Sequence, residues 1–414
     1  MRLRLRKKQE GASLLVKLKV LQIIDSLGMG GAETWLLELL RFWKDTFPQH
    51  ARMDFLLTSG RTGIFDEEAT RLGAQLFYVP YRKKSLLTFA QEFRRILRTG
   101  QYDAVHDHAD FVSGWHFLMG TGRLPAVRVT HVHNPAYQLL SNYGVNAGRR
   151  LSSRLGKHLV SKYATTVLGT SRQLLEEYGF SESPRFRPQG AALHCGFQLR
   201  RFAGDTNQCT VSLCREFGWE PQTPVILFAG RLDESLEFSH PRNHKNSAFA
   251  VAVFEECLKR NPRLKMIMAG ANEHMRSTFE GHLAKLGLSE SVRLLGIRKD
   301  IERLMLGSRV LLFPSRAEGL GMVAVEAQAA GLPVVASTAV PQECVVIPEI
   351  IHFEDLQTPV GTWAKTISCA MDQPRPEPTI EDTRWITSGF NIRVSSNLLE
   401  KVYLTGSIEK KVFA

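Results

Sequence analysis

The chain has 414 residues, of which 43% are hydrophobic and 23% are charged, and its formal net charge is +12. This length exceeds one ordinary hydrophobic core, so we expect two domains of roughly 200 residues. No apolar run approaches the roughly 20 residues of a membrane-spanning helix, which argues against an integral membrane protein. The basic segment 1–8 is followed by no apolar signal core or cleavage site, so we expect a cytoplasmic protein. Six cysteines without Cys-x-x-Cys spacing fit reduced thiols in that compartment.

The positive charge is concentrated in the first half of the chain. Residues 1–200 hold 29 Lys and Arg against 16 Asp and Glu, and the remaining residues hold 24 against 25. Such a surface suits peripheral contact with an anionic membrane at its inner face, or it is simply a solvated surface. A nucleic-acid partner is not expected, because the basic runs lack interleaved aromatic residues.

The first half alternates between apolar and amphipathic segments. Strands are predicted at residues 19–24, 53–57, 75–79, 104–108, 127–131 and 165–169. Helices are predicted after the turn 28–31, at 65–72 and 86–98, and after a cap at Ser171. Strand–helix alternation of this kind indicates an α/β fold with a doubly wound parallel sheet.

A polar, irregular stretch at residues 200–222 separates the two halves and predicts a linker, most narrowly 206–222. The alternation then restarts with strands at 225–229, 265–269, 292–295, 310–313 and 333–336 and helices at 245–260, 275–286 and 390–403. We therefore expect a basic extension (1–18), a first domain (19–205), a second domain (223–388) and a C-terminal helix (389–414) that crosses back to the first domain.

The segment 313–336 carries the most informative pattern. A buried strand is followed by Glu318, a glycine-rich turn at Gly319–Gly321 and a helix that contains Glu326. The eight-residue spacing predicts that both carboxylates lie near one face at the front of the helix. Free backbone N–H groups at a helix start suit an anion or a sugar hydroxyl, and two carboxylates suit a polyol.

This segment resembles the Glu-x7-Glu signature of retaining glycosyltransferases of family 4, and the chain is similar to the group 1 type that acts in bacterial exopolysaccharide and lipopolysaccharide biosynthesis. The resemblance implies the GT-B fold, two Rossmann-like domains facing each other across a cleft. It also implies that Glu318 contacts the hydroxyls of the donor sugar and that Glu326 contacts the ribose. The backbone of Gly319, Leu320 and Gly321 would support the sugar or phosphate.

Other segments match the same family. Gly30 and Gly31 resemble its first loop, where glycines face the donor diphosphate. Arg231 and Lys245 occupy the positions of the two cations that bind this diphosphate and stabilise the leaving group. The connection 233–244 is longer here than in the family, so Arg242 is an alternative to Lys245.

Two further residues match the family near the donor. Gly270 resembles the family's strand end near the donor phosphates, and Ile297 lies in a segment that resembles the one whose backbone reads the nucleobase. The resemblance thus places most donor-binding groups in the second domain.

Two histidine pairs follow strands in the first half: His106 with His108, and His131 with His133. Their i, i+2 spacing predicts that both members of a pair face one side of the sheet. A zinc site is one interpretation, but no cysteine or carboxylate completes a familiar ligand spacing, and core histidines are the other. The family resemblance implies that His133, or next His131, lies beside the donor sugar and the acceptor.

Residues 149–162 predict a basic amphipathic helix with an apolar seam of Leu151, Leu155 and Leu159. The helix either packs by this seam with a solvated basic face, or presents a surface to a membrane or an acceptor.

The resemblance implies a hexosyl- or N-acetylhexosaminyl-type transferase that uses a UDP- or GDP-sugar donor, a saccharide or lipid-linked saccharide acceptor, and no metal cofactor. A nucleotide-sugar epimerase of the same fold is one alternative, and the intact Glu-x7-Glu unit argues against it. A degenerate binding or scaffold protein of a polysaccharide assembly complex is another. Loss of Arg231 or Glu318 would favour that alternative, and both are present.

Overall fold

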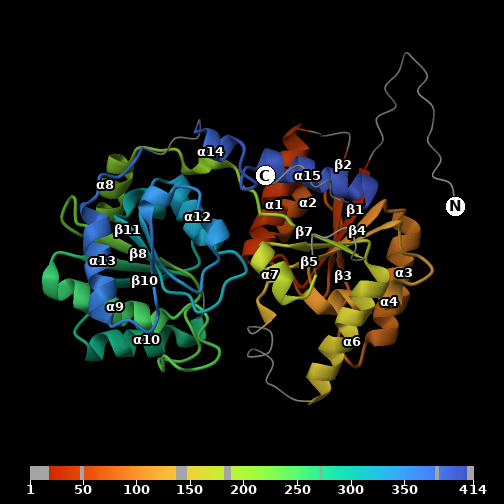
Figure 1. The fold of residues 1–414 in the computed structure, drawn as a ribbon, viewed down its shortest axis with the longest axis horizontal. Coiled ribbons are helices and arrows are strands. Elements are labelled where there is room, and N and C mark those ends of the chain that lie inside the picture. The colour runs from red at the N-terminus through yellow and green to blue at the C-terminus, as the bar shows by residue number, and fades with distance from the viewer. Residues whose placement is uncertain are drawn as a thin grey trace, which may run out of the picture.

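The computed structural model describes residues 18–46, 51–136, 147–180, 188–270, 273–377 and 382–407. Two α/β units lie side by side, each built on one parallel sheet (Figure 1). The first sheet has seven strands in the order β3-β2-β1-β4-β5-β6-β7, and the second has six in the order β10-β9-β8-β11-β12-β13. This is the arrangement of the GT-B fold predicted from the sequence. Most of the predicted basic extension, residues 1–17, lies outside the described residues.

The first unit alternates strands and helices along the chain. Its elements are β1 (Leu18–Ile24), α1 (Gly31–Thr46), β2 (Ala51–Leu57), α2 (Asp66–Arg71), β3 (Leu76–Tyr78), α3 (Leu86–Gly100), β4 (Ala104–Asp107), η1 (Asp110–Val112), α4 (Ser113–Gly120), β5 (Val127–Val132), α6 (Ala147–Tyr163), β6 (Thr166–Gly169), α7 (Arg172–Glu177) and β7 (Gln189–Ala192).

The second unit follows a short connection and repeats the alternation. Its elements are η2 (Leu199–Phe202), α8 (Thr206–Phe217), β8 (Val225–Ala229), α9 (Ser247–Arg260), β9 (Lys265–Ala269), α10 (Glu273–Lys285), β10 (Val292–Gly296), α11 (Ile301–Gly307), β11 (Val310–Phe313), α12 (Met322–Ala329), β12 (Val334–Ser337), η3 (Gln342–Cys344), η4 (Pro348–Ile350), β13 (Ile351–Glu354), α13 (Val360–Asp372), α14 (Thr383–Ile386) and α15 (Ile392–Thr405).

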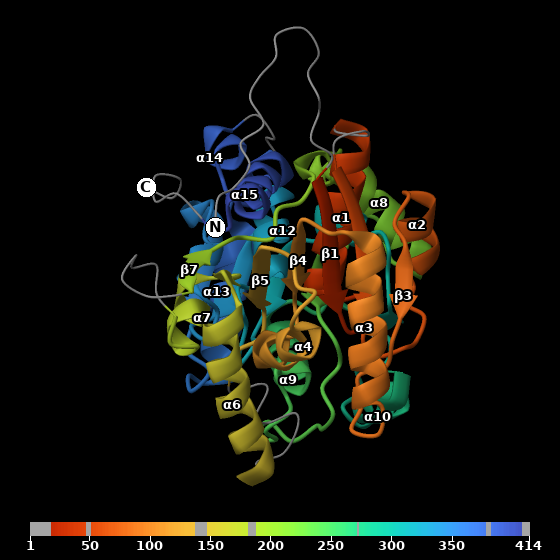
Figure 2. The ribbon, with the colours of Figure 1, turned by 90° about the vertical axis from the view of Figure 1, so that its right-hand side faces the viewer.

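Both sheets are covered by helices on their two faces, so their central strands are apolar throughout. In β8 every residue from Val225 to Ala229 is buried. In the first unit α1 and α15 pack on one face, and α3, α4, α6 and α7 pack on the other (Figure 2). Among the described residues no helix is both long and apolar enough to span a bilayer.

The prediction that residues 200–222 are irregular is wrong for most of the segment, because α8 occupies Thr206–Phe217. The side chain of Asp205 caps this helix by accepting a hydrogen bond from the Gln208 N–H at 2.9 Å. Only Leu213 and Cys214 of the helix are buried, so its apolar periodicity is too weak to stand out in the sequence.

Helix α6 also differs from one interpretation of its sequence, because only Leu159 of the leucine seam lies at the contact with α4. Leu151 and Leu155 are 58% and 43% exposed. The helix packs on α4 through glycines instead: a Cβ on Gly114 would lie 2.3 Å from the Gly156 carbonyl oxygen. Close backbone contact at these glycines turns the leucines away from the core.

The chain passes between the two units twice, and the two crossings run side by side. The Phe197 N–H donates to the Phe390 carbonyl at 2.9 Å, and the Ile392 N–H donates to the Phe197 carbonyl at 3.2 Å. A Cβ on Gly196 would lie 2.2 Å from the Ser395 Oγ, so glycine permits this close approach. After the second crossing α15 packs against α1 and β1 of the first unit.

Tyr403 of α15 is buried in the first unit, and we expect Tyr403→Ala to lower the free energy of unfolding by about 3–5 kcal/mol. Its hydroxyl accepts a hydrogen bond from Gln22 Nε2 at 3.0 Å and lies 2.7 Å from His106 Nδ1. Its ring contacts Trp43 edge to face. Urea unfolding measures the loss, and Leu404→Ala, at the exposed next position, is the matched control. Equal losses in the two variants would contradict the prediction.

Candidate functional site

Lys245 and Glu318, which were predicted from separate motifs, form an ion pair with 2.5 Å between Nζ and Oε1. Lys245 precedes α9, and Glu318 lies in the loop after β11, the strand next to β8 in the sheet. The two side chains are 24% and 12% exposed, so the pair is open to solvent on one side. The Lys245 ammonium group has further N–H donors and can hold an anion while it contacts Glu318.

The backbone around Lys245 is fixed by a buried carboxylate. Asp233 accepts hydrogen bonds from the Lys245 N–H at 3.0 Å and from the Ser247 N–H at 2.6 Å. Asp233 thus joins the start of the long connection 233–244 to the residues that follow its end. Arg242, the alternative cation, instead pairs with the exposed Glu234 at 2.7 Å. The structure thus places Lys245, and not Arg242, beside Glu318.

Glu318 and Glu326 do not share one face of a helix, which corrects the prediction from their spacing. Helix α12 begins at Met322, and Gly321 before it has φ 88, in the left-handed region. Glu318 therefore lies in the preceding loop, where it reaches Lys245. The helix could not extend back to Glu318, because a left-handed residue breaks the helical path.

Glu326 lies within a cluster of charges that joins both units. Arg201 of η2 donates to Glu38 of α1 at 2.7 Å and to Glu302 of α11 at 3.2 Å. Burial raises the pKa of Glu326 to about 7, the Arg201 cation opposes this shift, and Glu302 and Glu38 add to it. Glu326 therefore interacts with the charges around Arg201, whereas Glu318 pairs with Lys245.

We expect Glu326→Gln to stabilise the protein at pH 8 and to have little effect at pH 5. The folded protein holds the Glu326 proton more tightly than the unfolded chain, whose carboxyl has a pKa near 4.5. Stability is therefore lost as the pH rises from about 4.5 to about 7, and the glutamine variant lacks this loss. Melting temperatures across this range measure the effect, with the exposed Glu290→Gln as control. A difference from wild type that is independent of pH would contradict the prediction.

The glycine-rich loop before α12 touches the first unit. The Ser171 hydroxyl donates to the Gly319 carbonyl at 2.7 Å, and a Cβ on Gly319 would lie 2.1 Å from the His133 carbonyl oxygen. The Leu320 side chain is buried in the core of the second unit, so only its backbone can contact a ligand. This loop brings Glu318 next to the strand ends of the first unit.

The glycine-rich turn ends at Gly30 and α1 begins at Gly31; a Cβ on Gly30 would lie 2.3 Å from Glu33 Oε2. Burial raises the pKa of Glu33, Asp25 adds to this shift, and the Arg231 cation opposes it. The charge of Arg231 in the second unit therefore acts on the Glu33 carboxylate of the first. The sequence analysis missed Glu33, although it lies only two residues after Gly31 of the glycine-rich turn.

Gly270 and Ile297 lie at two neighbouring strand ends of the second unit. Gly270 has φ +148, its N–H donates to the Gly296 carbonyl at 2.8 Å, and its Cβ would lie 2.1 Å from the Gly230 carbonyl oxygen. Ile297 follows β10 and is exposed. Gly270 thus packs directly on the segment that carries Arg231, whereas Ile297 lies one strand further out.

His133 lies at the end of β5, where Asp110 holds its backbone. Asp110 has φ 50, a left-handed conformation, and its carboxylate accepts hydrogen bonds from the His133 N–H at 2.9 Å and from Asn134 Nδ2 at 3.0 Å. Burial lowers the pKa of His133 to about 3, so the imidazole is neutral at physiological pH. The sequence analysis did not single out Asp110; an aspartate two residues after a His pair was its only signal.

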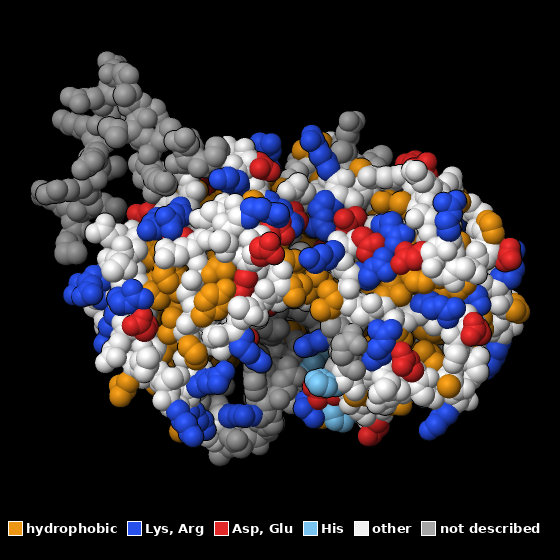
Figure 3. Space-filling model, turned by 180° about the vertical axis from the view of Figure 1, so that it is seen from behind, with side chains coloured by type: hydrophobic (Ala, Val, Ile, Leu, Met, Phe, Trp, Pro, Cys, Tyr) orange, Lys and Arg blue, Asp and Glu red, His pale blue; other side chains and the backbone are white. Residues whose placement is uncertain are grey.

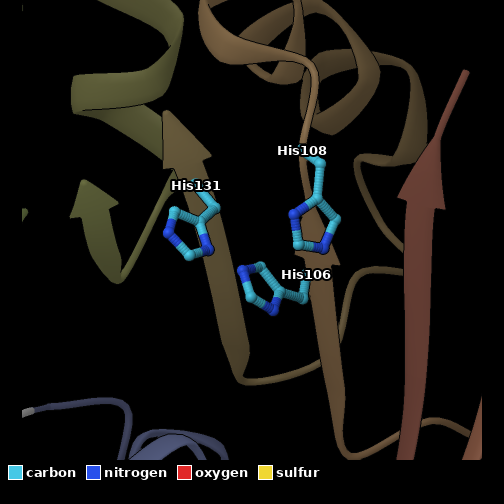
Figure 4. Close-up of side chains that lie close together, drawn as sticks. All are labelled: His106, His108 and His131. Atoms are coloured by element: carbon cyan, nitrogen blue, oxygen red, sulfur yellow. The ribbon is translucent and has the colours of Figure 1, made fainter. Parts of the chain in front are cut away.

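The four histidines of the two predicted pairs form one cluster in the first unit, with Trp35 in edge-to-face contact with three of them. Ring centroids are 4.2 Å apart within each pair, so both members of a pair face the same side, as predicted. Nitrogen atoms of His106, His108 and His131 lie within 4.8 Å of one another (Figure 4). This is the arrangement among the described residues that could hold a metal ion.

Two family models match the chain, and together they cover well over half of it. The model described as Glycosyltransferase Family 4 matches residues 29–184, and the model described as Glycosyl transferases group 1 matches residues 215–353. The first match contains the glycine-rich turn and His133. The second contains Arg231, Lys245, Glu318 and Glu326.

Similar proteins cover nearly the full chain. A protein named as the glycosyltransferase EpsF of Bacillus subtilis is 28% identical over 93% of this chain and 96% of its own length. The capsular polysaccharide biosynthesis glycosyltransferase CapH of Staphylococcus aureus is 22% identical over 94% and 100%. HepE of Anabaena, solved in complex with UDP-glucose, has a TM-score of 0.72 at 17% identity and covers 94% of this chain and 100% of its own. The structural likeness to HepE shows the shared fold.

Proposed function

This chain belongs to the family 4 glycosyltransferases with a group 1 second domain. From that premise we propose that it moves a sugar from a nucleoside-diphosphate sugar to a saccharide or lipid-linked saccharide acceptor. In this proposal the transfer retains the configuration of the sugar and serves cell-surface polysaccharide biosynthesis. The observation that carries the proposal is the Lys245–Glu318 pair. In this proposal Lys245 supplies a cation for the diphosphate and Glu318, in direct contact with it, supplies a carboxylate for the sugar hydroxyls.

Each group has a chemical task in this proposal. Lys245 and Arg231 bind the diphosphate and stabilise the negative charge that develops as the bond to the sugar breaks. Glu318 accepts hydrogen bonds from the sugar hydroxyls, and Glu326 binds the ribose. The acceptor attacks on the face that the diphosphate leaves, and a donor phosphate oxygen takes the acceptor proton. No metal cofactor is needed, since the two cations and the N–H groups at Gly319–Gly321 neutralise the phosphates.

The donor is proposed to carry uridine and a hexose or N-acetylhexosamine. HepE was solved with UDP and with UDP-glucose, which supports UDP as the first nucleotide to test. EpsF and CapH match nearly their full length, and the name of CapH supports a polysaccharide pathway.

A peripheral membrane contact is proposed for the first unit. Leu151 and Leu155 are exposed on α6 beside the exposed Arg150 and Arg154. On the face in Figure 3, Lys and Arg line the outer and lower edge of the first unit, at the left, whereas cations and carboxylates lie side by side in the second unit. Exposed leucines among arginines suit the surface of an anionic bilayer.

Thermal shift with UDP, GDP and their sugar conjugates tests the proposed function. A nucleotide at a concentration 100-fold above its Kd should raise the melting temperature by roughly 5 °C, because it binds only the folded state. Glu326→Ala should reduce this shift, and Glu290→Ala, at an exposed position on the same unit, should retain it. If no nucleotide shifts the folded wild type, the donor site is inactive and a scaffold role becomes the better hypothesis.

A further inference from the structure

We propose that the buried cluster of His106, His108 and His131 binds one divalent transition-metal ion of the zinc type. One ring nitrogen from each residue lies within 4.8 Å of the other two (Figure 4). Tetrahedral zinc with bonds of about 2.0–2.1 Å needs nitrogen atoms about 3.4 Å apart, which modest ring rotations achieve. The three rings come from the ends of two adjacent strands, β4 and β5, so the backbone holds them on one side of the sheet.

The cluster contains ring nitrogens that lack a partner in the described part of the chain. His106 Nε2 and both ring nitrogens of His131 are buried and make no hydrogen bond of normal geometry. The Leu193 backbone is a hydrogen-bonding group for one ring nitrogen of His131, which leaves the other nitrogen for a metal ion. An unpartnered buried nitrogen destabilises the folded protein, and a bound cation removes this cost at two rings at once.

Two polar side chains orient the rings from outside the cluster, as the outer partners of metal-binding histidines do. Tyr403 Oη lies 2.7 Å from His106 Nδ1, and Gln22 Oε1 lies 2.9 Å from His108 Nε2. These contacts leave Nε2 of His106 and Nδ1 of His108 for the cation. His133 Nε2 lies 2.9 Å from His108 Nδ1. When a metal ion binds His108 Nδ1, this hydrogen bond is lost, and His133 or a water becomes the fourth ligand.

The ligand set decides the kind of metal. Three neutral imidazoles suit zinc and other late first-row ions, whereas magnesium and calcium prefer oxygen ligands. Each neutral imidazole offers one nitrogen lone pair to a metal ion. The site is buried in the first unit and is proposed to be structural, with no part in the sugar transfer. It fixes the two strand ends that carry His133 and Asp110.

Metal stoichiometry on the tag-free protein tests the proposal. Wild type is stripped with chelator, given Zn²⁺ or Co²⁺, separated from free metal by gel filtration and analysed by elemental mass spectrometry. We expect about one metal ion per chain, and for cobalt the intense visible bands of four-coordinate nitrogen ligation. His106→Gln and His131→Gln should retain less than roughly one tenth of that metal. His158→Gln, which removes an exposed histidine of α6, should retain all of it.

Two results would overturn the proposal. One is a folded wild type that retains no stoichiometric metal, in which case an ordered water satisfies the free nitrogens. The other is full retention in His106→Gln or His131→Gln, which would place the metal elsewhere. Circular dichroism and melting temperatures check the fold of each variant. If one variant does not fold, the proposal is tested by the cobalt spectrum of wild type and by the metal content of the variant that does fold.

Discussion

Replacing Lys245 with alanine is expected to lower kcat for sugar transfer by roughly 10²–10³-fold, the usual cost of removing one group that stabilises transition-state charge. Lys245 contacts Glu318 and is fixed by the Asp233 carboxylate through its backbone N–H. The ammonium group is therefore held in place before any donor binds. Removing it also leaves Glu318 without its cation, so sugar positioning and leaving-group stabilisation fail together.

Steady-state kinetics with the donor identified by thermal shift measure this loss. Lys259→Ala is the matched control, because Lys259 is an exposed lysine of α9 that pairs only with Glu256 in the described structure. It should retain wild-type kcat, since exposed ion pairs contribute little. A Lys245→Ala enzyme with kcat within threefold of wild type would show that Arg231 alone serves the diphosphate, and the proposed role of Lys245 would be wrong.

The fold could be predicted from sequence because parallel sheets covered on both faces have continuous apolar strands. The predicted bounds of β8, β9 and β11 agree with the structure to the residue. Strand β7 was not predicted, since its sequence Gln-Gly-Ala-Ala lacks the branched and aromatic residues typical of strands. It forms because β6 offers a parallel partner and the core of the first unit covers it.

The candidate site was only partly predictable, because spacing along the chain does not fix direction in space. The sequence identified Lys245 and Glu318 but placed Glu318 on a helix. It also identified the four histidines in pairs, but not that the pairs merge into one cluster. Glu33 and Asp110 were missed because their significance depends on the other unit or on a left-handed backbone. Such features come from tertiary packing, and no local pattern records them.

Gly319→Ala is expected to lower the transfer rate by roughly 10²-fold while the nucleotide still binds, since displacing reacting groups by about 1 Å has effects of this size. An alanine Cβ would lie 2.1 Å from the His133 carbonyl oxygen and 3.1 Å from Thr170 Oγ1. The carbonyl is backbone at the end of a sheet strand and cannot rotate away. The loop that carries Glu318 must therefore move back from the first unit.

Separate measurements of kcat and of nucleotide-induced thermal shift distinguish this effect from a damaged donor site. Most of the shift should remain, because Arg231, Lys245 and Glu326 lie outside the displaced loop and still bind the nucleotide, whereas kcat should fall. Gly281→Ala is the matched control: it lies in α10 of the same unit, and its Cβ would meet nothing within 4 Å. Alanine is favoured over glycine inside a helix, so this control should be as stable as wild type or slightly more so. If Gly319→Ala retains the wild-type rate, contact between the loop and His133 is not needed for transfer, and the acceptor reaches the donor in a more open arrangement of the two units.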